Sequence, residues 1–331
     1  MISRRPMIGL AMVCAATLIV VAARLLVVRT LDGTFAIGWA GAVIGQFRID
    51  AVLAAAAAGA ALGVSGAIMQ TLLRNPLASP FVLGVTSGAG AGVALASLAA
   101  AWAGVAAPVG AALGVPALIG AVTALGLVLF LARRGGSIDP VTLILSGVIV
   151  GAIASALSTV AESLLPPERR GLLAGWLFGR IPDVPDPGAL AACAVAACGL
   201  TALAATWGSR LDAAALSDDE ARSVGVPLAP MRTAMFLGCG IATAASVALC
   251  GPIAFIGLLA PHCARAMVGP RNRTLVVGSA ITGAGLLIGA DALRQWIDIG
   301  GGRLPLGAVT AVAGGVAFLV LLRKTTGAWP R

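Results

Sequence analysis

The polar side chains that could carry chemistry are few, and they lie far apart in an apolar chain of 331 residues. Residues 63–66 form a GxSG tetrapeptide around Ser65, and His262 is the single histidine of the chain. A serine activated by a histidine base is the nucleophilic pair of an intramembrane serine protease. A four-residue match is weak in a sequence with 44 glycines, so packing roles are favoured for both side chains.

The chain carries no motif that would let it power a transport step by itself. A Walker A loop needs Gly-Lys-Ser/Thr, and the single lysine, Lys324, follows Arg323. Ion coupling would require acids or histidines inside membrane spans. Asp291 is such an acid, but Arg294 follows it one helical turn later, which predicts a structural ion pair. The six cysteines contain no CxxC pair, and neither a metal site nor a cofactor is expected. The energy for any transport step must therefore come from a partner protein.

The exposed segment with the strongest local signals is 209–230, SRLDAAALSDDEARSVGVPLAP. Ser217 and Glu220 form a capping box, and the two aspartates between them add negative charge to the first helical turn. Gly225, followed by Pro227, ends the predicted helix. The pattern predicts a short, doubly capped helix over about 218–224 that is displayed in the cytoplasm. Such a helix favours a contact surface for a partner, although a well-formed loop without a partner is the alternative.

The elements that must hold these residues are membrane helices. The chain is 59% hydrophobic and only 11% charged, which indicates a polytopic membrane protein rather than a soluble domain. The net charge of +9 is spread as single and paired bases between apolar runs, which is typical of loop anchoring and not of a nucleic-acid-binding stripe. No long polar block is present, so residues 1–331 are expected to form one transmembrane domain.

Ten apolar runs predict an all-α protein with about ten spans. The first run follows a basic head and is too long for a signal-peptide core, so it is interpreted as an uncleaved span. With both termini in the cytoplasm, most of the 22 basic residues fall on the cytoplasmic side, as the positive-inside rule requires. The predicted spans are 7–28, 50–72, 86–107, 111–132, 140–161, 189–207, 231–250, 254–268, 274–297 and 305–322.

The stretch 59–92 joins two glycine-rich runs through the polar residues 74–76. Glycine costs about 1 kcal/mol per interior site of a soluble helix. In a bilayer, small residues instead let helix backbones approach closely. We therefore predict two helices that pack together and are joined by a tight turn at the membrane face.

A faint internal repeat relates this stretch to a later one. Three residues recur at an offset of 185, which carries the second predicted span onto the seventh and predicts an inverted repeat of the kind found in transporters. The short run 254–268 is bounded by Gly251-Pro252, which predicts a broken or re-entrant segment. The recurring residues are Gly66, Pro76 and Gly84, matched by Gly251, Pro261 and Gly269.

Six stretches resemble the FecCD-type permeases, which are the membrane subunits of ABC importers for iron-siderophores, haem and cobalamin. The resemblance implies ten helices per subunit, two permease subunits that are identical or homologous, two cytoplasmic ATPase subunits and an external solute-binding protein. It also implies that the loop containing the capped helix docks in a cleft of the ATPase. The stretches are GAALGVSGAIMQTLLRNPLASPFVLGVTSGAG (59–90), LILSGVIV (143–150), GWLFG (175–179), ALSDDEARSVGVP (215–227), GPIAFIGLLAPHCARAMVGP (251–270) and LPLGAVTAVAGG (304–315).

The motifs assign residues to three expected roles. Coupling to the ATPase is expected of Ser217, Asp218, Asp219, Glu220, Ala221, Arg222, Ser223, Val224 and Gly225. A translocation or packing motif comprises Gly63, Ser65, Gly66, Gln70, Arg74, Asn75, Pro76, Gly84, Gly251, Pro252, Pro261 and His262. Docking of the binding protein is expected of Arg48 and Arg303, where the chain departs from the family: it reads Arg48-Ile49-Asp50-Ala51 in place of R-L-P-R, and Arg303 in place of an acid.

The function expected from the sequence is a non-catalytic permease subunit in the bacterial inner membrane, carrying an iron-siderophore-type chelate, haem or cobalamin. Two alternatives belong to other classes. One is an ion-coupled secondary transporter, which would work without an ATPase. The other is a rhomboid-type intramembrane serine protease built on Ser65 and His262. The sequence leaves open which chelate is carried and whether the permease pairs with itself or with a homologue.

Overall fold

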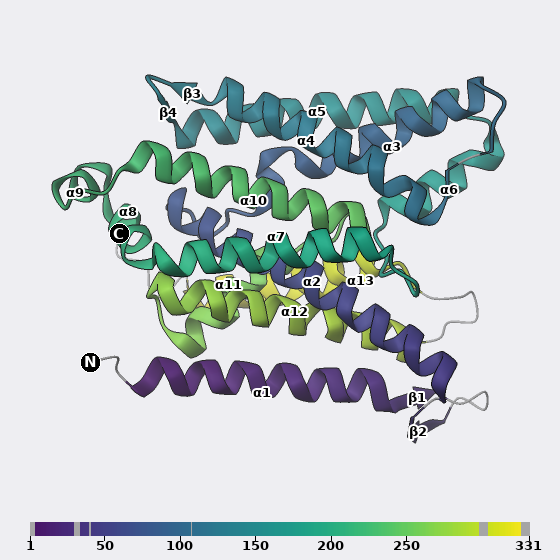
Figure 1. Ribbon diagram of the computed structural model, residues 1–331, viewed down its shortest axis with the longest axis horizontal. Coiled ribbons are helices and arrows are strands. Elements are labelled where there is room, and N and C mark those ends of the chain that lie inside the picture. Colours follow the sequence, from purple (N-terminus) through teal and green to yellow (C-terminus); the bar gives the residue numbers. More distant parts are fainter. Residues whose placement is uncertain (1–3, 30–33, 40, 107, 298–303, 326–331) are drawn as a thin grey trace.

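The computed structural model describes the chain except for residues 1–3, 30–33, 40, 107, 298–303 and 326–331 (Figure 1). The described residues are almost entirely helical. The helices are α1 (Arg4–Leu26), α2 (Ala42–Leu72), α3 (Val85–Trp102), α4 (Gly114–Leu131), α5 (Pro140–Leu164), α6 (Pro167–Leu177), α7 (Pro187–Thr206), α8 (Gly208–Leu216), α9 (Asp218–Ser223), α10 (Leu228–Cys250), α11 (Ile256–Val268), α12 (Asn272–Trp296) and α13 (Leu306–Thr325). Two 3₁₀ turns are η1 (Pro80–Leu83) and η2 (Gly110–Leu113), and two antiparallel hairpins pair β1 (Val27–Arg29) with β2 (Phe35–Ile37) and β3 (Arg133–Arg134) with β4 (Ser137–Ile138).

The expected set of about ten membrane helices is confirmed. Among the described residues, eight helices are long and apolar enough to cross a bilayer: α1, α2, α3, α4 with the preceding η2, α5, α7, α10 and α12. The shorter apolar helices α11 and α13 supply the other two. The short span predicted at 254–268 is the 13-residue helix α11, which follows a non-helical segment.

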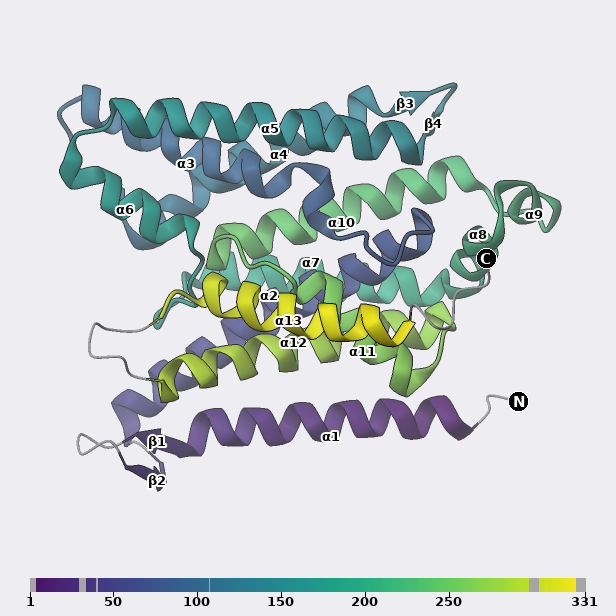
Figure 2. The same cartoon turned by 180° about the vertical axis from the view of Figure 1, so that it is seen from behind.

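The short elements mark the two ends of the bundle (Figures 1 and 2). The β1–β2 hairpin and α6 lie at one end, which we call the α6 end. The β3–β4 hairpin, α8 and α9 lie at the other, which we call the α9 end.

Two of the long helices, α5 and α7, begin with the same local sequence, an aspartate followed by proline. Asp139 and Asp186 accept hydrogen bonds from the backbone N–H of Thr142 and Ala189, at 2.7 and 2.8 Å, while the proline has no N–H and therefore needs no acceptor.

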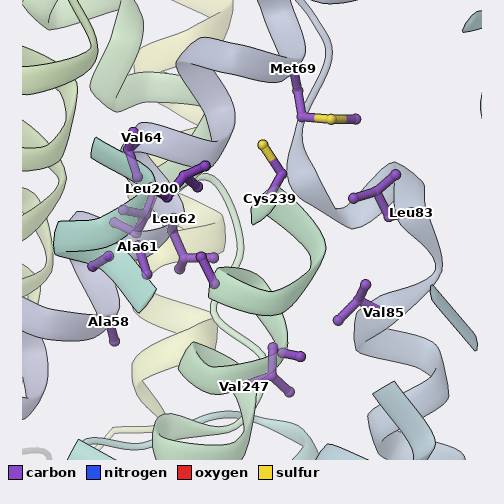
Figure 3. Packing of buried hydrophobic residues seen from close by; sticks show 14 of the residues in the cluster. Ala58, Ala61, Leu62, Val64, Met69, Leu83, Val85, Leu200, Cys239 and Val247 are labelled. Carbon is purple, nitrogen blue, oxygen red and sulfur yellow. The ribbon is translucent and has the colours of Figure 1, made fainter. Parts of the chain in front are cut away.

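Helix α2 lies at the centre of the bundle. It packs along α12, α10, α11 and α7, whereas α3, α4 and α5 form a separate group on one side (Figure 1). Small side chains make this possible: a Cβ atom added at Gly63 would lie 2.1 Å from the carbonyl oxygen of Ser279, and one at Gly59 would lie 2.3 Å from that of Gly283. The buried apolar residues of α2 face those of α7 and α10, including Leu200 and Val247 (Figure 3).

The prediction that the two helices of the 59–92 stretch pack on each other is wrong. Helix α3 packs on α4 and α5 instead of lying along α2. The chain between them is not a tight turn but the connection 73–84. Left-handed backbone at Arg74 (φ +49°) and Gly84 (φ +68°) turns it, and buried residues of η1 insert it among α2, α5 and α10. Helix α2 also begins at Ala42, earlier than predicted.

The three residue pairs behind the repeat do not share local structure. Gly66 lies inside α2, whereas its counterpart Gly251 follows the end of α10. Pro76 lies in a connection and Pro261 lies inside α11. Only the last pair, Gly84 and Gly269, occupies similar positions, with positive φ at a helix boundary. The inverted repeat therefore stays a prediction.

The close approach of α2 to its neighbours leaves no room for a side chain at several of its glycines. A Cβ atom at Gly66 would lie 1.7 Å from the carbonyl oxygen of Gly257, whereas one at Gly126 on α4 would meet no atom within 4 Å. We expect Gly66→Ala to force the backbones apart at a cost of roughly 1–3 kcal/mol, and Gly126→Ala to be neutral. Thermal unfolding in detergent measures the difference, and equal midpoints for the two variants would contradict it.

Candidate functional site

Helix α9 is capped at both ends by its own sequence, as predicted. The hydroxyl of Ser217 accepts a hydrogen bond from the backbone N–H of Glu220 at 3.0 Å and donates one to the Glu220 carboxylate at 2.7 Å. At the other end Gly225 is left-handed (φ +77°), and the N–H of Val226 donates to the carbonyl of Ala221 at 2.9 Å. These bonds make a Schellman motif that ends the helix. The helix is thus fixed locally at 218–223.

Asp218, the first residue of α9, joins this helix to the bundle. Arg232 on α10 donates to both carboxylate oxygens of Asp218, each at 2.8 Å, and Arg74 at the end of α2 donates to one of them at 2.5 Å. The Arg232 side chain is only 5% exposed. The hydrogen bond from Arg232, and then that from Arg74, holds the pKa of Asp218 below its usual range. The carboxylate is therefore ionised at physiological pH and clamps α9 to α2 and α10.

Helix α8 has two further attachments at the same end. Arg74 donates through Nε and Nη2 to the carbonyl of Ala214, at 3.0 and 2.9 Å. Asp212 accepts from the backbone and side-chain nitrogens of Asn272, each at 2.8 Å, and the Asn272 side chain in turn accepts from the Thr71 hydroxyl at 2.8 Å. The segment of α8 and α9 is thus bound to α2, α10 and the first turn of α12.

The outward face of this segment is free of contacts with the described bundle. The Asp219 side chain is 97% exposed, and Leu216 and Val224 are about as exposed as each other, at 68% and 69%. Ala221, in contrast, is fully buried against the bundle. A rigidly attached helix with two exposed apolar side chains beside its acids is suited to contact another protein. Leu216 was not identified as a candidate from the sequence.

The residues of the 59–92 motif meet α11 rather than forming an active site. Pro261 lacks an N–H, so the carbonyl of Gly257 loses its helical donor, and this carbonyl lies against Gly66. The next carbonyl, of Leu258, accepts from Gln70 at 3.3 Å and from the Nδ1 of His262 at 2.8 Å. Gln70 and His262 thus both bond to the carbonyl next to the one that the proline leaves without a helical donor.

Ser65 and His262 do not form the pair that a serine protease requires. The Ser65 hydroxyl donates to the carbonyl of Cys239 on α10 at 3.4 Å. The His262 ring donates to its own helix and packs edge-to-face on Phe318 with ring centroids 5.8 Å apart. Each side chain has its own partners, and both have the packing roles favoured from the sequence.

At the α6 end, three of the recognised stretches come together. The backbone N–H of Gly307 donates to the carbonyl of Phe178 at 2.9 Å, and that of Arg180 donates to Cys250 at 2.7 Å. A Cβ atom at Gly179 would lie 2.2 Å from the carbonyl oxygen of Pro252, so glycine is required there. The stretches 175–179, 251–270 and 304–315, far apart in sequence, therefore form one backbone junction.

A buried ion cluster lies at the same end. Asp291 accepts from Arg294 at 2.7 Å, as predicted, and also from Arg24 of α1 at 2.7 Å, which the sequence analysis missed. Arg48 donates to the carbonyl of Leu25 at 2.8 Å and is half-buried. Its docking role stays a prediction, and Arg303 lies outside the described residues.

The family and its members can now be compared with this chain. The model of the FecCD transport family matches residues 6–324. A probable iron chelatin transport system permease protein of Helicobacter pylori is 33% identical over 290 residues, covering 86% of this chain and 83% of that protein. A vitamin B12 import system permease protein BtuC of Citrobacter koseri is 35% identical over 282 residues, covering 85% and 83%. The cobalamin import system permease protein BtuC of Halobacterium salinarum is 32% identical over 283 residues, covering 85% and 73%.

Solved structures give the same result. The chain is similar to a metal-chelate type ABC transporter in an inward-facing conformation, with a TM-score of 0.81 and 26% identity, covering 96% of this chain and 98% of the other. PsaBC from Streptococcus pneumoniae in complex with Fab, at 16% identity and a TM-score of 0.55 over 83% and 90% of the two chains, shares the fold alone. Because the family model spans nearly the whole sequence and relatives above 30% identity align over most of it, the chain belongs to the FecCD transport family.

Proposed function

We propose that the chain is the permease subunit of an ABC importer that carries an iron-siderophore-type chelate, or haem or cobalamin, across the bacterial cytoplasmic membrane. The relatives named for iron chelatin and vitamin B12 import support this substrate class. Both termini and the α9 end face the cytoplasm, and the whole chain forms one transmembrane domain. Two permease subunits, identical or homologous, enclose the pathway, two cytoplasmic ATPase subunits drive it, and an external binding protein delivers the cargo to the α6 end.

The observation that carries this proposal is the clamp on Asp218. An ATPase that engages the exposed face of α9 would move Asp219, Val224 and Leu216 with it. Because Asp218 is bonded to Arg74 and Arg232, the force reaches the ends of α2 and α10 directly. Helix α2 packs along four other helices, so its displacement would tilt the central part of the bundle. This is a physical route from ATP hydrolysis to alternating access.

Ion coupling is less well supported by the geometry. Asp291 is the buried carboxylate of the described spans, and both of its oxygens accept from arginines at 2.7 Å. Both carboxylate oxygens are thus occupied by arginines, one from α1 and one from α12 itself, which favours a structural role. Asp291 is therefore assigned to holding α1 and α12 together.

The proposed function is tested by uptake into proteoliposomes. The chain reconstituted with its ATPase subunits and binding protein is expected to concentrate the chelate or corrinoid only with ATP. An ATPase-inactive partner should abolish uptake, and an ionophore should leave it unchanged. Uptake that persists with the inactive ATPase and collapses with the ionophore would instead support the secondary transporter.

The clamp itself is tested by a matched pair of substitutions. Asp218→Asn removes the charge held by two arginines, whereas Asp219→Asn removes a charge that is almost fully exposed. Leaving Arg232 buried without its carboxylate costs on the order of a few kcal/mol. We therefore expect roughly tenfold less uptake per ATP hydrolysed for Asp218→Asn and little change for Asp219→Asn. If the two variants took up the same amount of substrate per ATP hydrolysed, the clamp would be ruled out.

The pH dependence of the clamp follows from the lowered pKa of Asp218. The pKa of an aspartate in the unfolded chain is about 3.9, and that of Asp218 in the folded protein is lower. At pH values above the unfolded pKa, the ionised carboxylate contributes to the stability of the fold. This contribution is lost as the pH falls through the folded pKa. A spin label at Val224→Cys, in a background without the exposed Cys198, should stay immobile from about pH 8 to about pH 5. The label in Asp218→Asn should be mobile throughout. A wild-type label that becomes mobile near neutral pH would contradict the assignment.

A further inference from the structure

Two residues other than glycine have left-handed backbone in the part of the chain that the structure describes. One is Arg74 (φ +49°), whose side chain forms part of the clamp on Asp218. The other is Phe255 (φ +66°), which directly precedes α11 and has no role in the transport route described above. Left-handed backbone is unfavourable for any residue with a Cβ atom, so its presence at Phe255 points to a need for this side chain.

The Phe255 side chain lies against α13. A Cβ atom added at Gly314 would lie 2.5 Å from the Cβ of Phe255 and 2.8 Å from its Cγ, so the absence of a side chain at Gly314 makes room for the phenylalanine. A Cβ atom added at the next residue, Gly315, would lie 3.7 Å from the far end of the ring, which is an ordinary contact distance. The ring of Phe255 therefore fits closely onto α13 at one glycine.

Helix α13 packs on α11 and α12 along a narrow stripe (Figure 2). Leu306, Thr310 and Gly314 are buried at intervals of four residues, whereas Val312 and Val316 are 69% and 59% exposed. The helix also borders a hollow of about 470 Å³ that α1, α11 and α12 line with it. A helix that is held along one stripe beside a hollow depends on each contact of that stripe for its position.

Phe255 is also close to the contact between α11 and α2. Gly257 follows it by two residues, and a Cβ atom at Gly66 of α2 would lie 1.7 Å from the carbonyl oxygen of Gly257. The carbonyl of Leu258 accepts a hydrogen bond from Gln70 of α2 at 3.3 Å. Backbones in such close contact leave little room for one helix to move without the other. Close contacts thus lead from α2 through the start of α11 to α13.

We propose that Phe255 is a positioning residue for transport: its ring fixes α13 relative to α11 and carries α13 along when α11 moves. The proposal rests on the proposed function, in which the clamp on Asp218 displaces α2. That displacement would reach α11 where Gly66 meets Gly257, and the ring of Phe255 would pass it to α13. Without the ring, α13 would keep its helical structure but lose a fixed position.

Pulsed EPR on the isolated full-length chain tests the contact without any partner subunit. Spin labels are placed at Leu18→Cys on α1 and Val312→Cys on α13, both exposed positions, in a background without the three cysteines that are not fully buried. We expect Phe255→Gly and Gly314→Ala to shift or broaden the distance distribution, and Gly315→Ala to leave it as in the wild type. Wild-type distributions in both Phe255→Gly and Gly314→Ala would overturn the proposal.

A double variant shows whether Gly314→Ala acts through the ring. The added methyl group collides with Phe255, so Gly314→Ala should have little further effect on the distances once Phe255→Gly has removed the ring. Equal effects of Gly314→Ala with and without the ring would refute the contact as the cause.

Uptake into proteoliposomes that contain the ATPase subunits and the binding protein tests the role in transport. We expect Phe255→Gly and Gly314→Ala to take up roughly 2- to 30-fold less substrate per ATP hydrolysed, which is the range of effects for residues that couple distant sites. Gly315→Ala should match the wild type. If the wild type transports with ATP and Phe255→Gly has the same uptake per ATP, the positioning role is refuted while the proposed function stands. A wild type that does not transport with ATP would refute the proposed function and this role together, whereas the EPR distances still decide the contact.

Discussion

The close contact of α2 with α12 and α11 is the constraint on which the rest of the structure depends. Water cannot satisfy backbone groups inside a bilayer, and lipid gives no hydrophobic reason for helices to associate, so packing has to supply the cohesion. Gly59, Gly63 and Gly66 remove the side chains that would hold the backbones apart. The same contact accommodates the interruption of α11 at Pro261, because Gly66 lies against the carbonyl that the proline leaves without a donor. Helix α2 can then act as a rigid central element rather than as one span among ten.

Local features of the fold were predictable from the sequence, and long-range partners were not. The caps of α9 depend on residues within eight positions of one another, so Ser217, Glu220 and Gly225 specify them directly. Most membrane spans follow from hydropathy for the same reason. The packing of α3 on α4 and α5 instead of α2 depends on how the connection 73–84 turns inside the bundle, and no pattern in the stretch indicates that choice.

The candidate site shows the same division. Asp218 was identified through its place in a helix cap, but its two arginines come from residues 74 and 232, and only the tertiary structure brings them together. Arg24, near the end of α1, was not identified as a candidate from the sequence, yet it also bonds to Asp291. Arg294 was predicted to bond to Asp291, but one arginine leaves acceptor sites of a buried carboxylate without a donor. The unfilled sites indicate that a second donor is needed. They do not indicate that this donor is Arg24.

Both ends of the bundle use the same pairing, one carboxylate held by two arginines, but at different depths. At the α9 end, Arg74 and Arg232 converge on Asp218, whose side chain is 30% exposed, and they attach a small helix with exposed acids to the bundle. At the α6 end, Arg24 and Arg294 converge on Asp291, whose side chain is only 2% exposed, and they join α1 to α12. The depth of the carboxylate separates the two roles. A partner protein can reach the helix that carries Asp218, and a force on that helix is passed to α2 and α10 through its arginines. The pairing around Asp291 lies inside the bundle, where it can only hold helices together.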